Sequence, residues 1–182
     1  TPVIVRATTR LSHTRSPVFV GTRKEAEAKG WVDDSKKTVM IPGHARMRHP
    51  LVVERVEKLE DYFSNSPLNR WDKGDSGFGI VTHGTCYPYV KEVVPKASIL
   101  KLAASYPLPE KLIREFAATV ERVIVVEELE PVLEVEIRAL GIEAEGKAFF
   151  PRIGELPPEL VREGLAKAGL IDAPPAAHDW EV

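Results

Sequence analysis

Three short apolar runs alternate with segments of helical periodicity in the middle of the chain. The runs cover Phe78 to Thr82, Ser98 to Ala103 and Arg122 to Val126, and each is bounded by glycine or polar residues. Runs of this length are typical of β-strands and are too short for helices. Strands that alternate with helices form right-handed βαβ crossovers and a parallel sheet. The pattern therefore predicts a three-layer α/β domain with a mainly parallel sheet.

Apolar stripes with proline and glycine at their ends mark the helices of this region. Pro109 and Pro131 each stand where a helix is predicted to begin, and Gly141 stands where the second of these helices is predicted to end. The same pattern recurs from Pro158 to Ala168 and is closed by Gly169. The alternation of strands and helices therefore continues to the end of this third helix.

A further helix is predicted upstream of the central strands. Its apolar positions repeat at helical spacing, at Val52, Val56, Leu59 and Phe63. Pro50 suits the first turn of this helix, and Asn65-Ser66-Pro67 is predicted to end it. The polar segment Leu68 to Gly77 is predicted to be an exposed loop that leads into the sheet.

The N-terminal part of the chain contains shorter apolar runs. They are Val3 to Ala7, Val18 to Val20 and Thr38 to Ile41, and charged or polar stretches separate them. Such runs suit edge strands or a hairpin, which predicts an N-terminal β extension to the α/β domain. Thr1 stands where an initiator methionine would be expected, so we predict that the chain is a piece of a longer protein.

Charge and cysteine content narrow the functional classes. The chain has 25 Lys and Arg against 27 Asp and Glu, a net charge of −2, which argues against nucleic acid or an anionic membrane as a partner. No apolar run approaches the roughly 20 residues of a membrane span, so we expect a soluble, cytoplasmic protein. The single cysteine, Cys86, permits no internal disulfide and cannot by itself hold an iron–sulfur cluster, which takes about four thiolates.

The ends of the predicted strands are the first place to seek a ligand site. Open parallel sheets bind ligands just beyond the carboxyl ends of their strands, here His83-Gly84-Thr85, Ser105 to Pro107 and Glu127-Glu128. The backbone N–H groups of His83, Gly84 and Thr85 precede a predicted helix and could receive an anion. The alternative is an ordinary tight turn, because neither a G-x-G-x-x-G nor a P-loop pattern is present.

Three other groups of polar residues allow a functional interpretation beside a structural one. Ser12 and His13 lie in the donor-rich segment Thr9 to Ser16, which could orient a carboxylate or could be a polar loop capped by its own hydroxyls. Glu127 and Glu128 could supply a base, or one could cap the helix that follows. His83 and Cys86 are spaced for metal binding, but no second ligand pair stands nearby, so no metal site is predicted.

Four segments of the chain read GIVTHGTCYPYVKEVV, ASILKLAASYPLPEKLIREFA, VERVIVVEELEPVLEVEIRALGI and GKAFFPRIGELPPELVREGL. Together they resemble the middle of the alpha subunits of the indolepyruvate:ferredoxin oxidoreductase family. The opening RATTRLSHTRSPV, the PGHARMRHP segment and the SNSPLNRW loop extend the resemblance over essentially the whole chain. The combination of YPLPEKLIREF with VVEELEP is its most specific part.

The resemblance implies a parent enzyme that oxidatively decarboxylates indolepyruvate and other arylpyruvates to acyl-coenzyme A and passes electrons to ferredoxin. Its implied cofactors are thiamine diphosphate, Mg²⁺ and 4Fe–4S clusters, with coenzyme A as cosubstrate. Its implied partners are the neighbouring thiamine-binding modules of the same subunit, a beta subunit and ferredoxin. None of these cofactors is expected to be held by the present residues, because the family's catalytic and cluster motifs belong to other modules.

The resemblance also suggests a division of the chain. Residues 1–42 would contain the end of the preceding pyrimidine-binding module with connecting strands, residues 43–171 the transketolase C-terminal-like α/β domain, and residues 172–182 a linker. No catalytic residue is carried over, although Ser12 and His13 would lie nearest the family's active site. We therefore expect a scaffold and interface domain that is inactive alone. The alternative is a free-standing module that binds a nucleotide or coenzyme A near His83 to Thr85.

Overall fold

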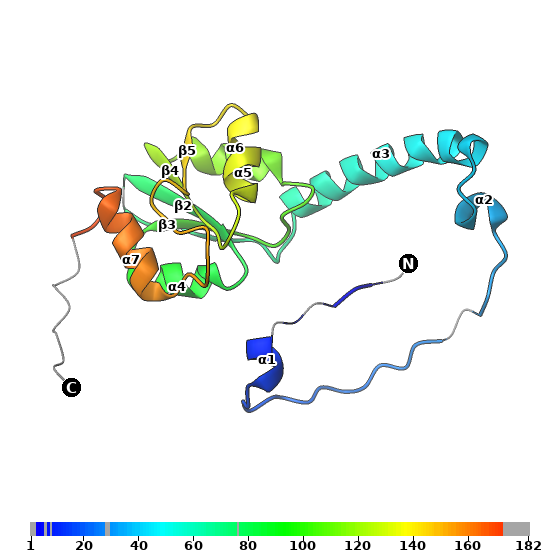
Figure 1. Cartoon of the computed structure of the whole chain (residues 1–182), viewed down its shortest axis with the longest axis horizontal. Helices are drawn as coiled ribbons and strands as arrows, with labels where there is room; N and C mark the ends of the chain where they lie inside the picture. Colours follow the sequence, from blue (N-terminus) through cyan, green and yellow to red (C-terminus); the bar gives the residue numbers. More distant parts are fainter. Residues whose placement is uncertain (1–2, 6, 8, 28–29, 76, 173–182) are drawn as a thin grey trace. The chain divides into compact units, whose positions relative to one another are not determined.

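The computed structural model describes residues 3–5, 7, 9–27, 30–75 and 77–172 of the chain, which forms two compact units, residues 1–39 and 40–182 (Figure 1). The described part of the first contains two short helices, α1 (Thr9–His13) and α2 (Ser35–Thr38). Asp34 caps α2, where its carboxylate accepts a hydrogen bond from the Lys37 N–H at 3.1 Å.

The predicted N-terminal β extension is wrong for the described residues. Residues 3–5, 7, 18–20 and 39–41 form no strand, and Thr38 ends α2. The apolar side chains of these runs are exposed, Phe19 completely so. A strand is stable only when its backbone pairs with a neighbour and one of its faces is covered, and the described residues of this segment show neither. Apolar composition alone therefore did not produce strands here.

The second unit contains a five-stranded sheet in the order β1-β3-β2-β4-β5. The three predicted central strands are confirmed as β2 (Phe78–His83), β3 (Ser98–Leu102) and β4 (Arg122–Val126), and both β3 and β4 pair with β2 in parallel. A two-residue strand, β5 (Ala144–Glu145), adds a further parallel partner beside β4.

Strand β1 (Arg70–Asp72) was not anticipated, because its residues fall in the segment predicted to be a loop. It pairs antiparallel with the edge of β3. Trp71 of β1 packs edge-on against Phe116 with ring centroids 5.5 Å apart. A three-residue strand carries too little periodicity to be recognised from sequence, and its single large apolar residue gains a partner only in the folded domain.

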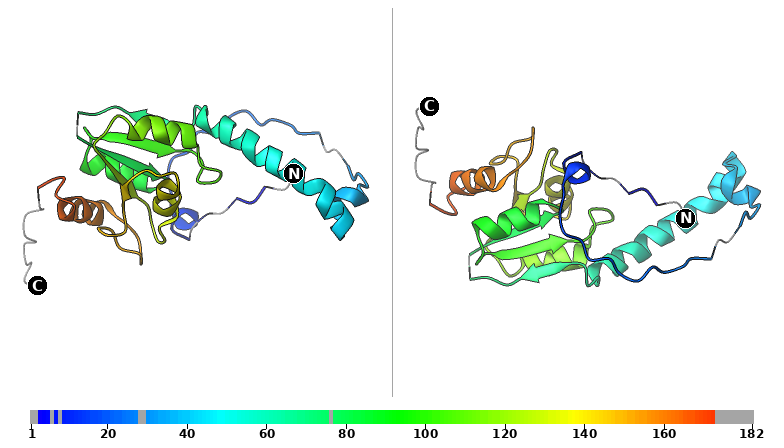
Figure 2. Two further views of the ribbon diagram at one scale, coloured as in Figure 1. Left: turned by 90° about the horizontal axis from the view of Figure 1, so that it is seen from above. Right: turned by 90° about the horizontal axis from the view of Figure 1, so that it is seen from below.

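Helices cover both faces of the sheet, which gives the predicted three layers (Figure 2). Helices α4 (Cys86–Val93) and α7 (Pro158–Lys167) pack on one face, and α5 (Glu110–Ala117) and α6 (Val132–Ala139) pack on the other. Neighbouring strand residues divide between the two cores, because side chains alternate across a strand. Ile80 and Ile124 face the first core, whereas Val81 and Val125 face the second.

Helix α3 (Pro42–Ser64) precedes the sheet and is longer than predicted. The expected start at Pro50 is wrong, because Pro42 occupies the first turn and Pro50 lies inside the helix. An interior proline removes one backbone hydrogen bond and disfavours a helix, but the residues on both sides of Pro50 remain helical. No residue of α3 is buried. Within the described ranges, no helix is both long and apolar enough to cross a membrane.

Candidate functional site

The carboxyl ends of β2 and β4 form the topological switch point of the sheet. The chain leaves β2 through α4 toward β3, and it leaves β4 through α6 toward β5, on the opposite side. Helices α4 and α6 cover opposite faces of the sheet. The two loops therefore diverge above neighbouring strands, which is the position where open α/β sheets commonly hold ligands.

The strand register brings two groups of predicted site residues to this point. Thr82 aligns with Val126, and its hydroxyl donates a hydrogen bond to the Val126 carbonyl at 2.7 Å. His83 therefore ends β2, and Gly84 and Thr85 follow it, beside the place where Glu127 and Glu128 follow β4. Gly84 has a φ of 56°, a left-handed conformation that favours glycine. His83 is half-buried, whereas Gly84 and Thr85 are exposed.

Glu127 caps helix α6. Its side chain is almost fully buried, and its two carboxylate oxygens accept hydrogen bonds from the backbone N–H groups of Leu133 at 2.8 Å and Glu134 at 3.0 Å. These N–H groups have no partners within the helix, and the positive end of the helix dipole stabilises the carboxylate. The prediction that one of the two glutamates caps the following helix is confirmed, and Glu127 is not positioned as a free base.

Lys147 completes this polar group, and no pattern in the sequence predicted its part in it. Its ammonium donates hydrogen bonds to the carbonyls of Glu127 and Pro151, and its backbone N–H donates to the Glu134 carboxylate at 2.7 Å. Burial lowers the pKa of Lys147, although Glu127 and other nearby acidic groups oppose that shift. The preceding residue must be small, since a Cβ on Gly146 would lie 2.6 Å from the Glu134 carboxylate.

The pKa of the Cys86 thiol shows that the switch point is buried and negatively charged. The thiol is buried, and burial followed by the charge of Glu128 raises its pKa to about 11, although Lys147 acts in the opposite direction. A thiol with this pKa is protonated near neutral pH and is a poor nucleophile. The negative charge beside it also disfavours an anion at His83 to Thr85. The site therefore contains neither an activated thiol nor a cationic cradle.

The rim of the switch point carries exposed apolar side chains. Tyr106 follows β3 and is 77% exposed, Leu129 follows β4 and is 55% exposed, and Ile153 is 89% exposed. The loop that holds Ile153 is fixed to the end of β4, because the Leu156 N–H donates to Glu128 at 3.4 Å and Arg152 pairs with Glu130. We call Tyr106, Leu129 and Ile153 the strand-end surface. Exposed apolar side chains near one edge of a sheet suit contact with another protein surface.

The described residues of the chain do not fit a metal ion or an iron–sulfur cluster. In the part of the chain that the structure describes, no three His, Cys, Asp or Glu residues are grouped closely enough to hold a metal. Cys86 is the only cysteine of the sequence, and it is buried in the core. Ser12 and His13 lie on α1 in the first unit with exposed side chains. Their suggested role in catalysis remains a prediction.

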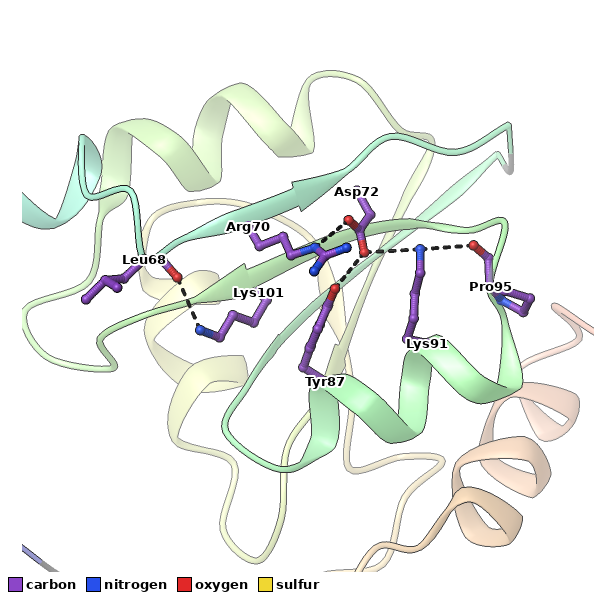
Figure 3. Close-up of polar contacts among 7 residues, drawn as sticks. All are labelled: Leu68, Arg70, Asp72, Tyr87, Lys91, Pro95 and Lys101. Atoms are coloured by element: carbon purple, nitrogen blue, oxygen red, sulfur yellow. Dashed lines mark hydrogen bonds and ion pairs between the residues drawn. The ribbon is translucent and has the colours of Figure 1, made fainter. Parts of the chain in front are cut away.

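A second polar cluster joins β1 to α4 (Figure 3). The Asp72 carboxylate pairs with Arg70 at 2.8 Å and Lys91 at 3.1 Å, and it accepts a hydrogen bond from the Tyr87 hydroxyl at 2.9 Å. Burial alone would raise the pKa of Asp72, but these three partners bring it below its ordinary value. Lys101 donates instead to the Leu68 carbonyl at 3.1 Å. Because the Asp72 carboxylate is paired with side chains of β1 and α4, we assign the cluster a structural role.

Comparison with known proteins identifies relatives of one type. The chain is 39% identical over 176 residues to indolepyruvate oxidoreductase subunit IorA of Archaeoglobus fulgidus, covering 92% of this chain and 28% of that subunit. The corresponding subunit of Thermococcus kodakarensis is 36% identical, with 94% and 29% covered, and that of Methanothermobacter thermautotrophicus is 33% identical, with 100% and 31% covered. The chain thus spans about three tenths of the length of these curated relatives. No family model matches it.

A solved structure shares the fold. It is the 2-oxoglutarate:ferredoxin oxidoreductase from Magnetococcus marinus with 2-oxoglutarate, coenzyme A and succinyl-CoA bound. The similarity has a TM-score of 0.56 at 22% identity and covers 72% of this chain and 24% of that chain. At this identity, the similarity establishes the three-layer α/β architecture and carries no residue roles.

Proposed function

We propose that this chain, a relative of one segment of the IorA subunits of indolepyruvate oxidoreductases, is the central transketolase C-terminal-like domain of such a subunit. The observation that carries the proposal is the 32–39% identity to six IorA subunits over 91–100% of the chain. The domain would tie the catalytic modules together and supply contact surface between them. As in the sequence-based division, residues 1–42 would end the preceding module, 43–171 would form the domain, and 172–182 would begin a linker.

The proposed parent oxidatively decarboxylates indolepyruvate and related arylpyruvates to acyl-coenzyme A, with ferredoxin as the electron acceptor, in the cytoplasm. Thiamine diphosphate, Mg²⁺ and iron–sulfur clusters would be held by its other modules, because the described residues of this chain offer no grouped metal ligands. Thiamine diphosphate supplies the carbanion chemistry of such a decarboxylation. The present residues would contribute position and contact, together with a beta subunit.

The geometry of the strand ends supports a contact role. Glu127 is occupied by the N-terminus of α6, and Lys147 is bound to backbone carbonyls. The Glu127 carboxylate and the Lys147 ammonium therefore hold the fold together and are not free to act as a base or to receive a ligand. What remains at the edge is the strand-end surface of Tyr106, Leu129 and Ile153, which is exposed and apolar.

The test is made in the complete subunit that contains this segment, assembled with its partner subunit. Leu129→Glu combined with Ile153→Glu should weaken association of the modules and reduce arylpyruvate-dependent reduction of ferredoxin, because both changes place charge in an apolar contact. Val135→Glu is the matched control, since Val135 is a similarly exposed valine on α6. If the double variant retained full activity, or if this chain alone turned over indolepyruvate with added thiamine diphosphate, the proposal would be wrong.

The alternative is a free-standing module that binds nucleotide or coenzyme A at His83, Gly84 and Thr85. Its position at the switch point and the exposed turn at Gly84 favour it. The adjacent charges of Glu127 and Glu128, which raise the pKa of Cys86, weigh against it. Calorimetry of this chain with coenzyme A and with thiamine diphosphate separates the two functions: the contact role predicts no binding heat, whereas saturable binding of coenzyme A would favour the alternative.

A further inference from the structure

Helix α3 presents a long apolar face that its own unit contacts only toward the helix C-terminus, where α5 lies beside it. The helix spans 23 residues, none of them buried; on this face Val52 and Leu59 are 44% and 37% exposed, and Val56 and Phe63 are half-buried. Figure 1 shows it as one continuous helix. Helices of globular proteins normally bury their apolar stripe against another element. An uncovered stripe of this length therefore points to a partner.

Five apolar residues of α3, together with His49, follow a seven-residue repeat, whereas Met47, Leu51 and Val53 lie outside it. Steps of four and three residues alternate along Ala45, His49, Val52, Val56, Leu59 and Phe63. This alternation is the pattern by which two helices pack along a coiled-coil seam. We call these six residues the α3 seam. In heptad terms, His49, Val56 and Phe63 occupy a positions, and Ala45, Val52 and Leu59 occupy d positions. The internal proline, Pro50, occupies a b position away from the seam.

The first part of α3 is basic, whereas its second part carries four acidic residues against two basic ones, Arg55 and Lys58. Arg46 and Arg48 lie in the first part of the helix, and no acidic residue precedes Glu54. The acidic residues of the helix follow in its second part, at Glu54, Glu57, Glu60 and Asp61. Two parallel copies would place like charges beside each other, whereas two antiparallel copies would place the basic end of each helix beside the acidic end of the other.

We propose that the α3 seam binds the α3 seam of a second copy of this chain, with the two helices antiparallel about a two-fold axis near Glu54. In this register Ala45 packs on Phe63 of the second copy, His49 packs on Leu59, and Val52 packs on Val56. Each a position thus meets a d position, so every layer of the interface contains residues of the seam. A two-fold interface requires this self-complementarity.

The residues that flank the seam agree with the same register. The e positions pair Arg46 with Glu60 of the second copy, twice by symmetry, and bring the two Val53 residues together at the axis. The g positions pair Arg48 with Tyr62 of the second copy, which allows a cation–π contact. The one unfavourable contact brings Arg55 beside its own counterpart. Opposite-charge flanking pairs determine which partner and orientation a seam accepts.

The surroundings of Glu60 fit this pairing. Burial raises the pKa of Glu60, and the negative charges of Glu110, Asp61 and Glu57 add to the shift. A carboxylate among like charges is stabilised when a cation approaches it. Arg46 of the second copy would supply that cation. The proposal concerns α3 alone and does not depend on the function proposed above.

The experiment measures the mass of the 182-residue chain by sedimentation equilibrium over a range of concentrations. A reversible dimer is expected. Val56→Asp should give a monomer with an unchanged circular dichroism spectrum, because Val56 lies on a helix without buried residues. A monomeric native chain would overturn the proposal and would indicate that another part of the protein, or a different protein, covers the seam.

Charge reversal tests the orientation. Arg46→Glu and Glu60→Arg should each weaken the dimer by about tenfold or more, since each creates two like-charge contacts. The double variant should restore the native dissociation constant. Glu57→Arg makes the same charge change outside the seam and should leave the dimer nearly intact. A double variant no stronger than either single variant would exclude the antiparallel register, as would an Arg55→Leu variant that failed to strengthen the dimer.

Discussion

At the scale of single residues, the buried carboxylate of Glu127 caps the N-terminus of helix α6. Glu127 uses both carboxylate oxygens to accept the free N–H groups of α6, and Lys147 binds the Glu127 carbonyl above it. A carboxylate buried without such partners would be costly, because it would lose its hydration without replacement. The sequence indicated a cap at the glutamate pair, but it could not show which glutamate would be buried or that Lys147 would reach it.

Glu127→Ala should destabilise the domain substantially. The substitution leaves two buried N–H groups without acceptors, and each such group costs about 1–3 kcal/mol. We therefore expect the free energy of unfolding to fall by about 2–4 kcal/mol in urea titrations followed by circular dichroism. Glu128→Ala is the control, because Glu128 is half-buried and its carboxylate accepts one long hydrogen bond, of 3.4 Å, from the Leu156 N–H. Equal losses in the two variants would contradict the capping role.

At the scale of elements, short strands depend on contacts that lie far away in the sequence. Strand β1 has three residues and a single strand neighbour, β3. Trp71 packs on Phe116 of α5 on one side, and Asp72 binds Tyr87 and Lys91 of α4 on the other. These contacts attach β1 to helices on both faces of the sheet. A prediction from local periodicity could not find this strand, because the strand and helices that hold it lie far away in the sequence.

Asp72→Asn should weaken this attachment in a pH-dependent way. The pKa of Asp72 is held below its ordinary value of 3.8 in the folded chain. The stabilisation is therefore fully present above the unfolded pKa and is lost as the pH falls through the lower, folded pKa. We expect the variant to be about 1–2 kcal/mol less stable near pH 7, since hydrogen bonds to charged groups are among the stronger ones.

Urea titrations between pH 2 and pH 7 test this expectation. The difference between native chain and variant should shrink toward the acid end of the range, because Asp72 then loses its charge in the native chain as well. Asp61→Asn is a suitable control on α3, since Asp61 is exposed. A difference that stayed constant across this range would show that the charge of Asp72 is not what stabilises β1.

At the scale of the whole molecule, the two units of the chain differ in packing. Residues 40–182 contain both hydrophobic cores, whereas large apolar side chains among the described residues of the first unit, such as Ile4, Phe19 and Trp31, are exposed. Exposed apolar residues over such a length suit a segment that is ordered by contact with another surface. In the proposed parent, that surface would belong to the preceding thiamine-binding module.

Limited trypsin digestion should distinguish the two units. Proteases cleave exposed backbone that has few stabilising contacts. We expect first cleavage at Arg15, Arg23 or Lys24, all of which are exposed, and accumulation of a product that retains β2 to α7. Mass spectrometry of the products identifies the sites. Early cleavage inside the sheet unit, with residues 1–39 intact, would contradict this division of stability.

The sequence by itself determined the central strands and the helices after them, because apolar period, proline and glycine act on the chain locally. Strand pairing, the burial of Glu127 by α6, the approach of Lys147 and the existence of β1 were decided only by tertiary structure, because each joins residues distant along the chain. The N-terminal apolar runs illustrate the same limit. Their composition favours strands, but a strand requires a partner, and local sequence does not specify one.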